Sequence, residues 1–510
     1  MTAAALGESA LASTHEQTKL AKGANGAGLL TVLLMGLFIT NVDVAVANVA
    51  TPSIHERLNA SGSELQLVIS GYILSYAMLL ITGARLGDMF GYRRLFLAGL
   101  TIFTVSSLAC GLAPNTIVLI LGRVVQGIGA ALMVPQVLIG IQQNFSDEAR
   151  TRALGYYSVA MSIGAVAGQV LGGVLVSANL FNTGWRPIFL INLPIGVGVM
   201  FAALRYLPAD TGGRPRRLDL WGVGTLSTAA LLAILPLILG HTQGWPAWIW
   251  VCLAASIVPL AAFVVVEQRI AVRGGYPLIN LQLVTRPAVA WGLAAYAAAN
   301  STYFSLLFTL ALYLQQGLGK SPLYSGLALV LWVAAFGIGG PVVPRLPARL
   351  TRFVAPFGYL ILVASYLALG VSLFTNHSGG ALLFGLLGFG GLGLGIGFTA
   401  TIRRLTAAAS ARYAPDISGL ITTVSQIAGV TGIATFGSVY FSLVQPASPR
   451  TATHAFAVVT GAFAVVALFA TIAAYQSSNA PVATEPADQS TATSGKMSVG
   501  ARPAQTCARP

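Results

Sequence analysis

Apolar side chains fill fourteen long runs along the chain, and short segments that carry most of the charges separate these runs. Each run contains 18 to 27 residues with few or no charges. A helix rises about 1.5 Å per residue, so a run of this length crosses the roughly 30 Å hydrocarbon core of a bilayer. The pattern therefore predicts fourteen membrane-spanning helices, over residues 27–50, 65–84, 95–113, 115–140, 153–177, 187–204, 220–240, 247–266, 288–314, 322–344, 353–374, 381–402, 417–443 and 455–475.

The composition excludes most other classes of protein. Of the 510 residues 55% are apolar and only 8% are charged, with a mean hydropathy of +0.78. A soluble domain carries charge on roughly a quarter of its residues, which rules out a soluble enzyme or a nucleic-acid-binding protein. The three cysteines have no paired spacing, and the runs contain no cluster of His, Cys or carboxylate residues. We therefore expect no enzymatic activity, no metal, no cofactor and no nucleic-acid partner.

The basic residues predict how the chain is oriented. Of the 28 Lys and Arg residues, 23 lie in the tails or in loops on their side, and four lie in the opposite loops. Cytoplasmic loops are enriched in Lys and Arg, so we expect both termini in the cytoplasm. The excess of Arg over Lys, with abundant Ala and Gly, suggests a GC-rich bacterial genome. The prediction is a multi-pass protein of the bacterial cytoplasmic membrane, monomeric and surrounded by lipid.

The spacing of two arginine-rich loops indicates a repeat. Residues 85–94 follow the second run and residues 345–352 follow the tenth. Both follow the second helix of a six-helix unit if runs seven and eight are an inserted pair, and duplicated halves are common in secondary transporters. The predicted fold is all-α, with a cytoplasmic N-terminal tail (1–26), an N-terminal six-helix half (27–204), an inserted helix pair with cytoplasmic linkers (205–287), a C-terminal six-helix half (288–475) and a disordered cytoplasmic tail (476–510).

Two opposite charges lie deep inside predicted spans. Asp43 is the only acidic residue well inside a run, and Arg123 is the only basic one. A carboxylate in mid-membrane costs roughly 2.5–3.5 kcal/mol on insertion scales, so such residues usually mark an ion or substrate path. Both lie about 10 Å from the outer end of their helix at 1.5 Å per residue. Their matching depths predict a pair whose separation would favour protonation of Asp43. A static ion pair is the alternative.

The loop after the second run combines a carboxylate, a glycine and two adjacent arginines. The carboxylate can accept hydrogen bonds from the N-terminus of a neighbouring helix or from arginines of the next cytoplasmic loop, which would hold that side in one state. A plain positively charged loop is the alternative. The predicted conformational lock consists of Asp88, Gly91, Arg93, Arg94, Arg150 and Arg152.

Small and aromatic residues mark two further faces. Glycines recur at four-residue spacing in the fifth run, where they favour either a static seam or a sliding contact between helices. The ninth run carries an aromatic and amide stripe, which suits either a pocket for a flat lipophilic ligand or ordinary packing. The candidate pocket residues are Asn48, Gln126, Tyr296, Asn300, Tyr303 and Phe304.

Several of these segments resemble motifs of the major facilitator superfamily, in its branch of drug:proton antiporters with fourteen spans. Residues 41–52 are similar to that branch's first-helix motif, whose Asp position, here Asp43, is implicated in coupling. Residues 83–94 resemble the superfamily's loop motif, and residues 122–127 resemble the fourth-helix motif whose Arg is linked to proton transfer. Residues 185–196 also match the branch at the sixth span.

The fifth span is similar to the branch's antiporter motif, with Gln in a position where the family usually has Pro. The motif residues are Gly164, Gly168, Gln169, Gly172 and Gly173. The resemblance covers roughly residues 27–475 and implies the major facilitator fold, with two inserted central helices.

The resemblance and the buried charges together predict a proton-coupled exporter. We expect the protein to exchange hydrophobic drugs, antibiotics or secondary metabolites for protons by alternating access, with the proton gradient as its energy source. Asp43 would carry the proton, and Arg123 would set how readily Asp43 binds it. The alternative is a carrier of one defined metabolite or siderophore, for which drug efflux is incidental.

Overall fold

The computed structural model describes residues 24–210, 219–273, 281–343, 347, 351–375, 380–408, 414–444 and 448–480. Fourteen helices among these residues are long and apolar enough to cross a membrane, which confirms the predicted number of spans. The helices of the N-terminal half are α2 (Ala24–Leu58), α3 (Gly62–Phe90), α4 (Tyr92–Gly111), α5 (Thr116–Asn144), α6 (Asp147–Ala178), α7 (Pro187–Leu190) and α8 (Asn192–Tyr206).

The remaining helices form the inserted pair and the C-terminal half. The inserted pair comprises α9 (Leu220–Gln243), α10 (Ala247–Ala255) and α11 (Ile257–Val272), followed by the short α12 (Leu281–Val284). The C-terminal half consists of α13 (Pro287–Leu312) with the π-helical turn η2 (Tyr313–Gly317), α14 (Pro322–Val342), α15 (Thr351–Phe374), α16 (Ala381–Ala408), α17 (Ala414–Leu443) and α18 (Pro449–Asn479). The last helix thus continues four residues beyond the predicted end of the half, and residues 481–510 of the predicted tail lie outside the described residues.

Proline breaks two of the predicted spans. The sixth span divides between α7 and α8, and the eighth divides between α10 and α11. Pro194 has no N–H to donate to the carbonyl of Leu190, the last residue of α7. Pro259 stands in the same relation to Ala255, the last residue of α10. Hydropathy does not reveal such a break, because the break depends on the loss of a single backbone N–H donor.

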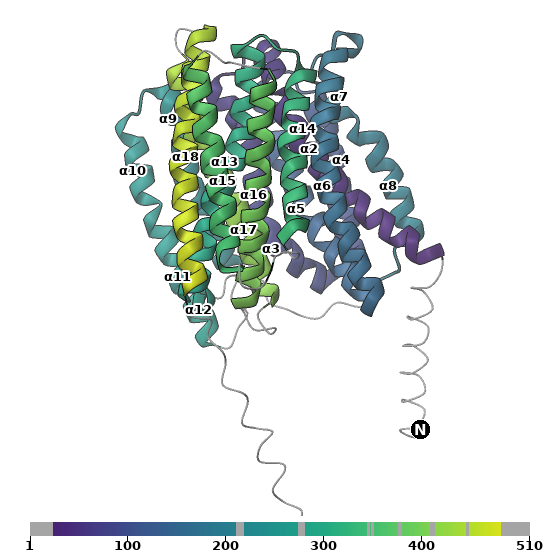
Figure 1. Cartoon of the computed structure of the whole chain (residues 1–510). Coiled ribbons are helices and arrows are strands. Elements are labelled where there is room, and N and C mark those ends of the chain that lie inside the picture. Colours follow the sequence, from purple (N-terminus) through teal and green to yellow (C-terminus); the bar gives the residue numbers. More distant parts are fainter. Residues whose placement is uncertain are drawn as a thin grey trace, which may run out of the picture.

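The two halves repeat one packing scheme. In the N-terminal half α2 packs on α6, and α3 and α4 both pack on α5. In the C-terminal half α13 packs on α17, and α14 and α15 both pack on α16. The inserted helix α9 packs on α3 and α17, and Figure 1 shows α10 and α11 at the margin of the bundle.

The halves meet at the end of the bundle opposite the start of α2 and the end of α18, here called the outer end (Figure 1). Helix α6 packs on α14, and α3 packs on α17. The amide of Gln315 donates 3.0 Å to the carbonyl of Val49, and the N–H of Leu323 donates 3.1 Å to Oγ of Ser177. The outer ends of the two halves are therefore joined in this structure.

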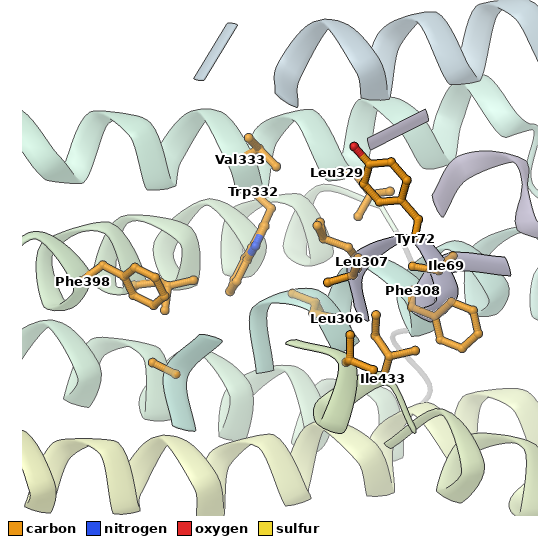
Figure 2. Close-up of a cluster of buried hydrophobic side chains, with 14 of the residues drawn as sticks. Ile69, Tyr72, Leu306, Leu307, Phe308, Leu329, Trp332, Val333, Phe398 and Ile433 are labelled. Carbon is orange, nitrogen blue, oxygen red and sulfur yellow. The ribbon is translucent and has the colours of Figure 1, made fainter. Parts of the chain in front are cut away.

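Apolar side chains fill the region between the halves. Figure 2 shows Ile69 and Tyr72 of α3 close to Leu307 and Phe308 of α13, with Leu329 of α14 beside them. All five are buried in one hydrophobic cluster. Close van der Waals packing stabilises this contact, because lipid tails are as apolar as these side chains.

Candidate functional site

A buried ion pair lies at the centre of the N-terminal half. Asp43 of α2 and Arg123 of α5 are both 0% exposed, and Nη1 of Arg123 donates to Oδ2 of Asp43. The two side chains that the sequence predicts to lie at matching depths are therefore in direct contact. Because either charge would be costly to bury alone, each of the two residues needs the other in order to lie in this interior.

Two amide side chains complete the coordination of the carboxylate. The amide nitrogens of Gln126 and Asn192 each donate 2.9 Å to Oδ1 of Asp43. The same nitrogens donate to Oγ of Ser107, at 2.6 Å and 3.2 Å. Oδ2 of Asp43 thus has a donor from α5, and Oδ1 has one donor from α5 and one from α8.

The guanidinium has two further hydrogen bonds and two aromatic neighbours. Nε of Arg123 donates 3.0 Å to the carbonyl of Val68, and Nη1 donates 2.7 Å to Oε1 of Gln126. The ring of Tyr72 lies 4.3 Å from the guanidinium carbon, and that of Phe189 lies 5.5 Å away. An aromatic face attracts a cation by about 0.5–2 kcal/mol, so these rings hold the charge without competing for the carboxylate.

Asn192, Ser107 and Tyr72 also belong to this site and are not among the site residues predicted from the sequence. Asn192 stands where proline interrupts the sixth span, at the first residue of α8, and this places its amide beside α2. A polar residue in an apolar run is a weak signal on its own, because many bond only to their own helix. Gln126, a predicted pocket residue, lies against the carboxylate of Asp43.

The predicted lock loop forms a tight turn between α3 and α4. Gly91 has a φ of +96°, and Asp210 accepts hydrogen bonds from the main-chain N–H of Arg93 (3.0 Å) and Arg94 (3.2 Å). An added Cβ at Gly91 would overlap the carboxylate of Asp210. A carboxylate at a helix N-terminus satisfies free N–H groups and the helix dipole. Asp210 was not among the predicted lock residues.

The other predicted lock residues lie at the same end of the bundle. Asp88 is part of the last turn of α3, and Arg152 is exposed on α6. Arg150 donates to the carbonyls of Phe145 (2.9 Å) and Gln142 (3.2 Å). The role of Asp88 as a lock stays a prediction. Residues 344–346 and 348–350 of the second loop copy lie outside the described residues.

The glycines of the antiporter motif allow two close helix contacts. A Cβ on Gly164 would lie 3.0 Å from Cβ of Asn41, and one on Gly172 would lie 3.0 Å from the side chain of Val46, both on α2. A Cβ on Gly168 would also clash with α2. Gly173 faces the other way, since its Cβ would lie 3.0 Å from Cα of Leu323 on α14. Helix α6 therefore carries a seam on each side.

The predicted pocket residues separate into different parts of the molecule. Tyr296, Asn300, Tyr303 and Phe304 belong to α13, whereas Asn48 is buried on α2 and donates to its own helix. The ring of Tyr303 lies 5.6 Å from that of Phe336 on α14.

Two further contacts extend this aromatic group. The ring of Tyr296 lies 4.6 Å from that of Phe398 on α16, and Asn300 donates 2.7 Å to Oγ of Ser425 on α17. The C-terminal half thus has an aromatic cluster formed by Tyr296, Tyr303, Phe304, Phe336 and Phe398.

Two similar six-helix units, with opposite charges buried inside one of them, define a polytopic membrane transporter. Residues 33–433 match the family model described as Major Facilitator Superfamily. The chain belongs to this superfamily. Among the residues that the structure describes, no group of three His, Cys, Asp or Glu side chains is placed to bind a metal.

Curated relatives match over most of the chain. It is 34% identical to the "Probable actinorhodin transporter" of Streptomyces coelicolor, over 81% of this chain and 72% of that protein. It is 36% identical to the "Cephamycin export protein CmcT" of Amycolatopsis lactamdurans, over 82% and 85% respectively. The "Multidrug resistance protein Stp" of Mycobacterium tuberculosis is 32% identical, over 81% and 76%. With its fourteen spans, the protein is a multi-pass protein of the bacterial cytoplasmic membrane.

Solved structures show the same fold at lower sequence identity. A bacterial homologue of the human lysosomal transporter Spinster, in an inward-facing and occupied conformation, aligns with a TM-score of 0.67 and 16% identity. The alignment covers 91% of this chain and all of that one. A bacterial homologue of the human peptide transporters PepT1 and PepT2 aligns with a TM-score of 0.61 and 17% identity.

Proposed function

We propose that this protein exports hydrophobic antibiotics, drugs or secondary metabolites in exchange for protons, by alternating access between its two halves. The relatives named for export or resistance support the direction of transport. The observation that carries proton coupling is the sealed cluster around Asp43, in which a carboxylate and a guanidinium are both 0% exposed.

Protonation and the integrity of this cluster are linked. A proton on Asp43 cancels the charge that attracts Arg123 and occupies an oxygen that now accepts a hydrogen bond. The buried guanidinium then has a weaker partner, so the helices that hold the two residues are free to rearrange. Because α2 and α5 both belong to the N-terminal half, this rearrangement changes how that half meets its partner.

The aromatic cluster of the C-terminal half is the proposed substrate surface. Tyr303 and Phe336 are partly exposed, whereas Phe398 is buried. Asp416 is the only acidic residue between positions 288 and 475. Such a surface favours flat, uncharged aromatic substrates, which stack on the rings and need no counter-ion. Exchange of one neutral substrate for one proton would move one charge per cycle.

Inverted vesicles with an established proton gradient test the proposal. We expect neutral aromatic compounds to cause proton release with the wild type and none with Asp43→Asn, because Asn cannot carry the proton. The matched control is Glu64→Gln, which removes a half-buried carboxylate from the first turn of α3, away from the Asp43 cluster, and leaves proton release intact. Coupled transport by Asp43→Asn at the wild-type rate would refute the role of Asp43.

A second candidate function is export of one compound only. Several relatives are named for a single antibiotic, among them the "Methylenomycin A resistance protein" of Streptomyces coelicolor, which is 32% identical. The same vesicle assay separates the two proposals. A response to many unrelated compounds supports broad efflux, and a response to one structural class supports a dedicated exporter.

A further inference from the structure

The outer ends of α6 and α14 approach at backbone distance. A Cβ on Gly173 of α6 would lie 3.1 Å from the carbonyl oxygen of Pro322. A Cβ on Gly326 of α14 would overlap the carbonyl oxygen of Gln169. Small residues on both helices thus make one closed seam between the two halves, here called the α6–α14 seam. No side chain other than a very small one fits at these crossing points.

The α6–α14 seam buries a glutamine side chain without a hydrogen-bond partner. Gln169 is 0% exposed, and among the described residues neither Oε1 nor Nε2 of its amide has a donor or acceptor. Ser325, next to Gly326 on the facing helix, is also 0% exposed, and its Oγ also lacks a partner there. Buried polar atoms are nearly always paired, because the loss of water is otherwise uncompensated. The closed seam is therefore a costly arrangement for these two side chains.

A cavity of about 380 Å³ opens at the outer end of the same seam. Its lining includes Val176 and Asn179 of the α6 side and Gln315, Lys320 and Pro322 of the other half. Val176 is two helical turns from Gln169 along α6. Separation of the outer ends of α6 and α14 would extend this cavity along the seam and bring water to the two unpaired side chains.

We propose that Gln169 is a gating residue of the outer exit, whose unpaired amide favours separation of α6 from α14 and is hydrated when they part. This inference rests on the proposed alternating access. The apolar contacts in Figure 2 and the hydrogen bonds at the outer end hold the two halves together, and the buried amide opposes them. Gln at this position thus keeps the two states close in free energy, whereas an apolar residue would favour the closed one.

The test is the rate at which a membrane-impermeant maleimide labels Ser325→Cys from the outer side. The native cysteines are first replaced (Cys110→Ala, Cys252→Ala, Cys507→Ala). Because residue 325 is buried in the closed seam, the labelling rate follows the population with separated helices. We expect Gln169→Leu to slow labelling about 5-fold or more, since removing an unpaired buried amide shifts the equilibrium by at least that factor. Gln169→Asn, which keeps a carboxamide, should label at nearly the original rate.

A matched control is Gln136→Leu, which makes the same change at a buried glutamine outside the seam, where the amide donates to Gly83 and Leu132. This control should leave labelling unchanged. An unchanged or faster rate with Gln169→Leu would overturn the proposal. If Gln169→Leu does not fold, Gln169→Met tests the same expectation with a more flexible side chain.

Labelling without substrate or proton gradient separates this proposal from the proposed function. If Asp43→Asn still couples transport while Gln169→Leu slows labelling, the coupling site is wrong and the gate stands. If the reverse holds, the gate is wrong and the coupling site stands.

Discussion

The two halves have the same helix packing but opposite interiors. Inside the N-terminal half, Ser107 of α4 and Asn192 of α8 surround the pair of Asp43 and Arg123. The helices in the corresponding places of the C-terminal half, α15 and α18, instead contribute Tyr366 and Phe463.

Aromatic contacts hold the C-terminal half together. The ring of Tyr366 lies 6.0 Å from that of Trp332 and 5.3 Å from that of Phe463, and Phe463 lies 4.8 Å from Phe436. Such a core has one stable arrangement, because close packing is lost when any ring moves. A buried ion pair has two stable arrangements, because the attraction between its charges disappears when the carboxylate is protonated. This difference fits the proposed division, in which the N-terminal half responds to protons and the C-terminal half provides the surface for substrate.

The largest expected effect comes from breaking the ion pair. Arg123→Leu leaves Asp43 buried without its counter-charge and should lower the free energy of unfolding by about 3–5 kcal/mol. The double variant Asp43→Leu with Arg123→Leu leaves this interior uncharged, like that of the C-terminal half among the described residues, and should recover most of the loss. Unfolding in mixed detergent micelles measures both.

The same double variant should not release protons in exchange for substrate. If the double variant loses as much unfolding free energy as Asp43→Leu and Arg123→Leu lose together, the two side chains do not interact directly. Retained coupling in the double variant would contradict the assignment of proton transfer to the N-terminal half.

The second prediction concerns the aromatic core of the C-terminal half. Phe463→Ala removes contacts to both Tyr366 and Phe436 and should cost about 3 kcal/mol of unfolding free energy. The number of protons released per substrate should not change, because the Asp43 cluster is untouched. Phe463→Leu is the control and should cost less. A changed proton ratio in Phe463→Ala would show that the halves do not divide these roles.

The smallest expected effects lie in the loops. Gly91→Ala should cost about 2 kcal/mol, because alanine strains at positive φ and its Cβ overlaps Asp210. Gly380, before α16, also has a positive φ (+84°), but nothing lies within 4 Å of an added Cβ. Gly380→Ala should therefore cost about 1 kcal/mol, from backbone strain alone. Equal losses of unfolding free energy in the two variants would show that the carboxylate of Asp210 moves away easily.

The number of spans and the depth of the buried charges followed from the sequence. Fourteen apolar runs are long enough to cross a bilayer, and lipid leaves a spanning chain few alternatives to the helix. Asp43 and Arg123 stood out because charges are rare in such runs. By contrast, the sequence did not distinguish Asn192, which contacts Asp43, from Asn48, which bonds to its own helix.

The features that the sequence determined act over a few residues, whereas those that the fold decided act between distant parts of the chain. Hydropathy, charge placement and glycine spacing act within one helix or one loop, so they determined the helices and the polar positions along them. Which side chains meet depends on how helices cross, and this decided the shell of Asp43, the contact of Asp210 with α4, and the unpaired amide of Gln169. The contacts of Asp43 and Asp210 join residues that are 80 or more positions apart, and the amide of Gln169 is buried without a partner among the described residues. A linear pattern contains no information on such contacts or on their absence.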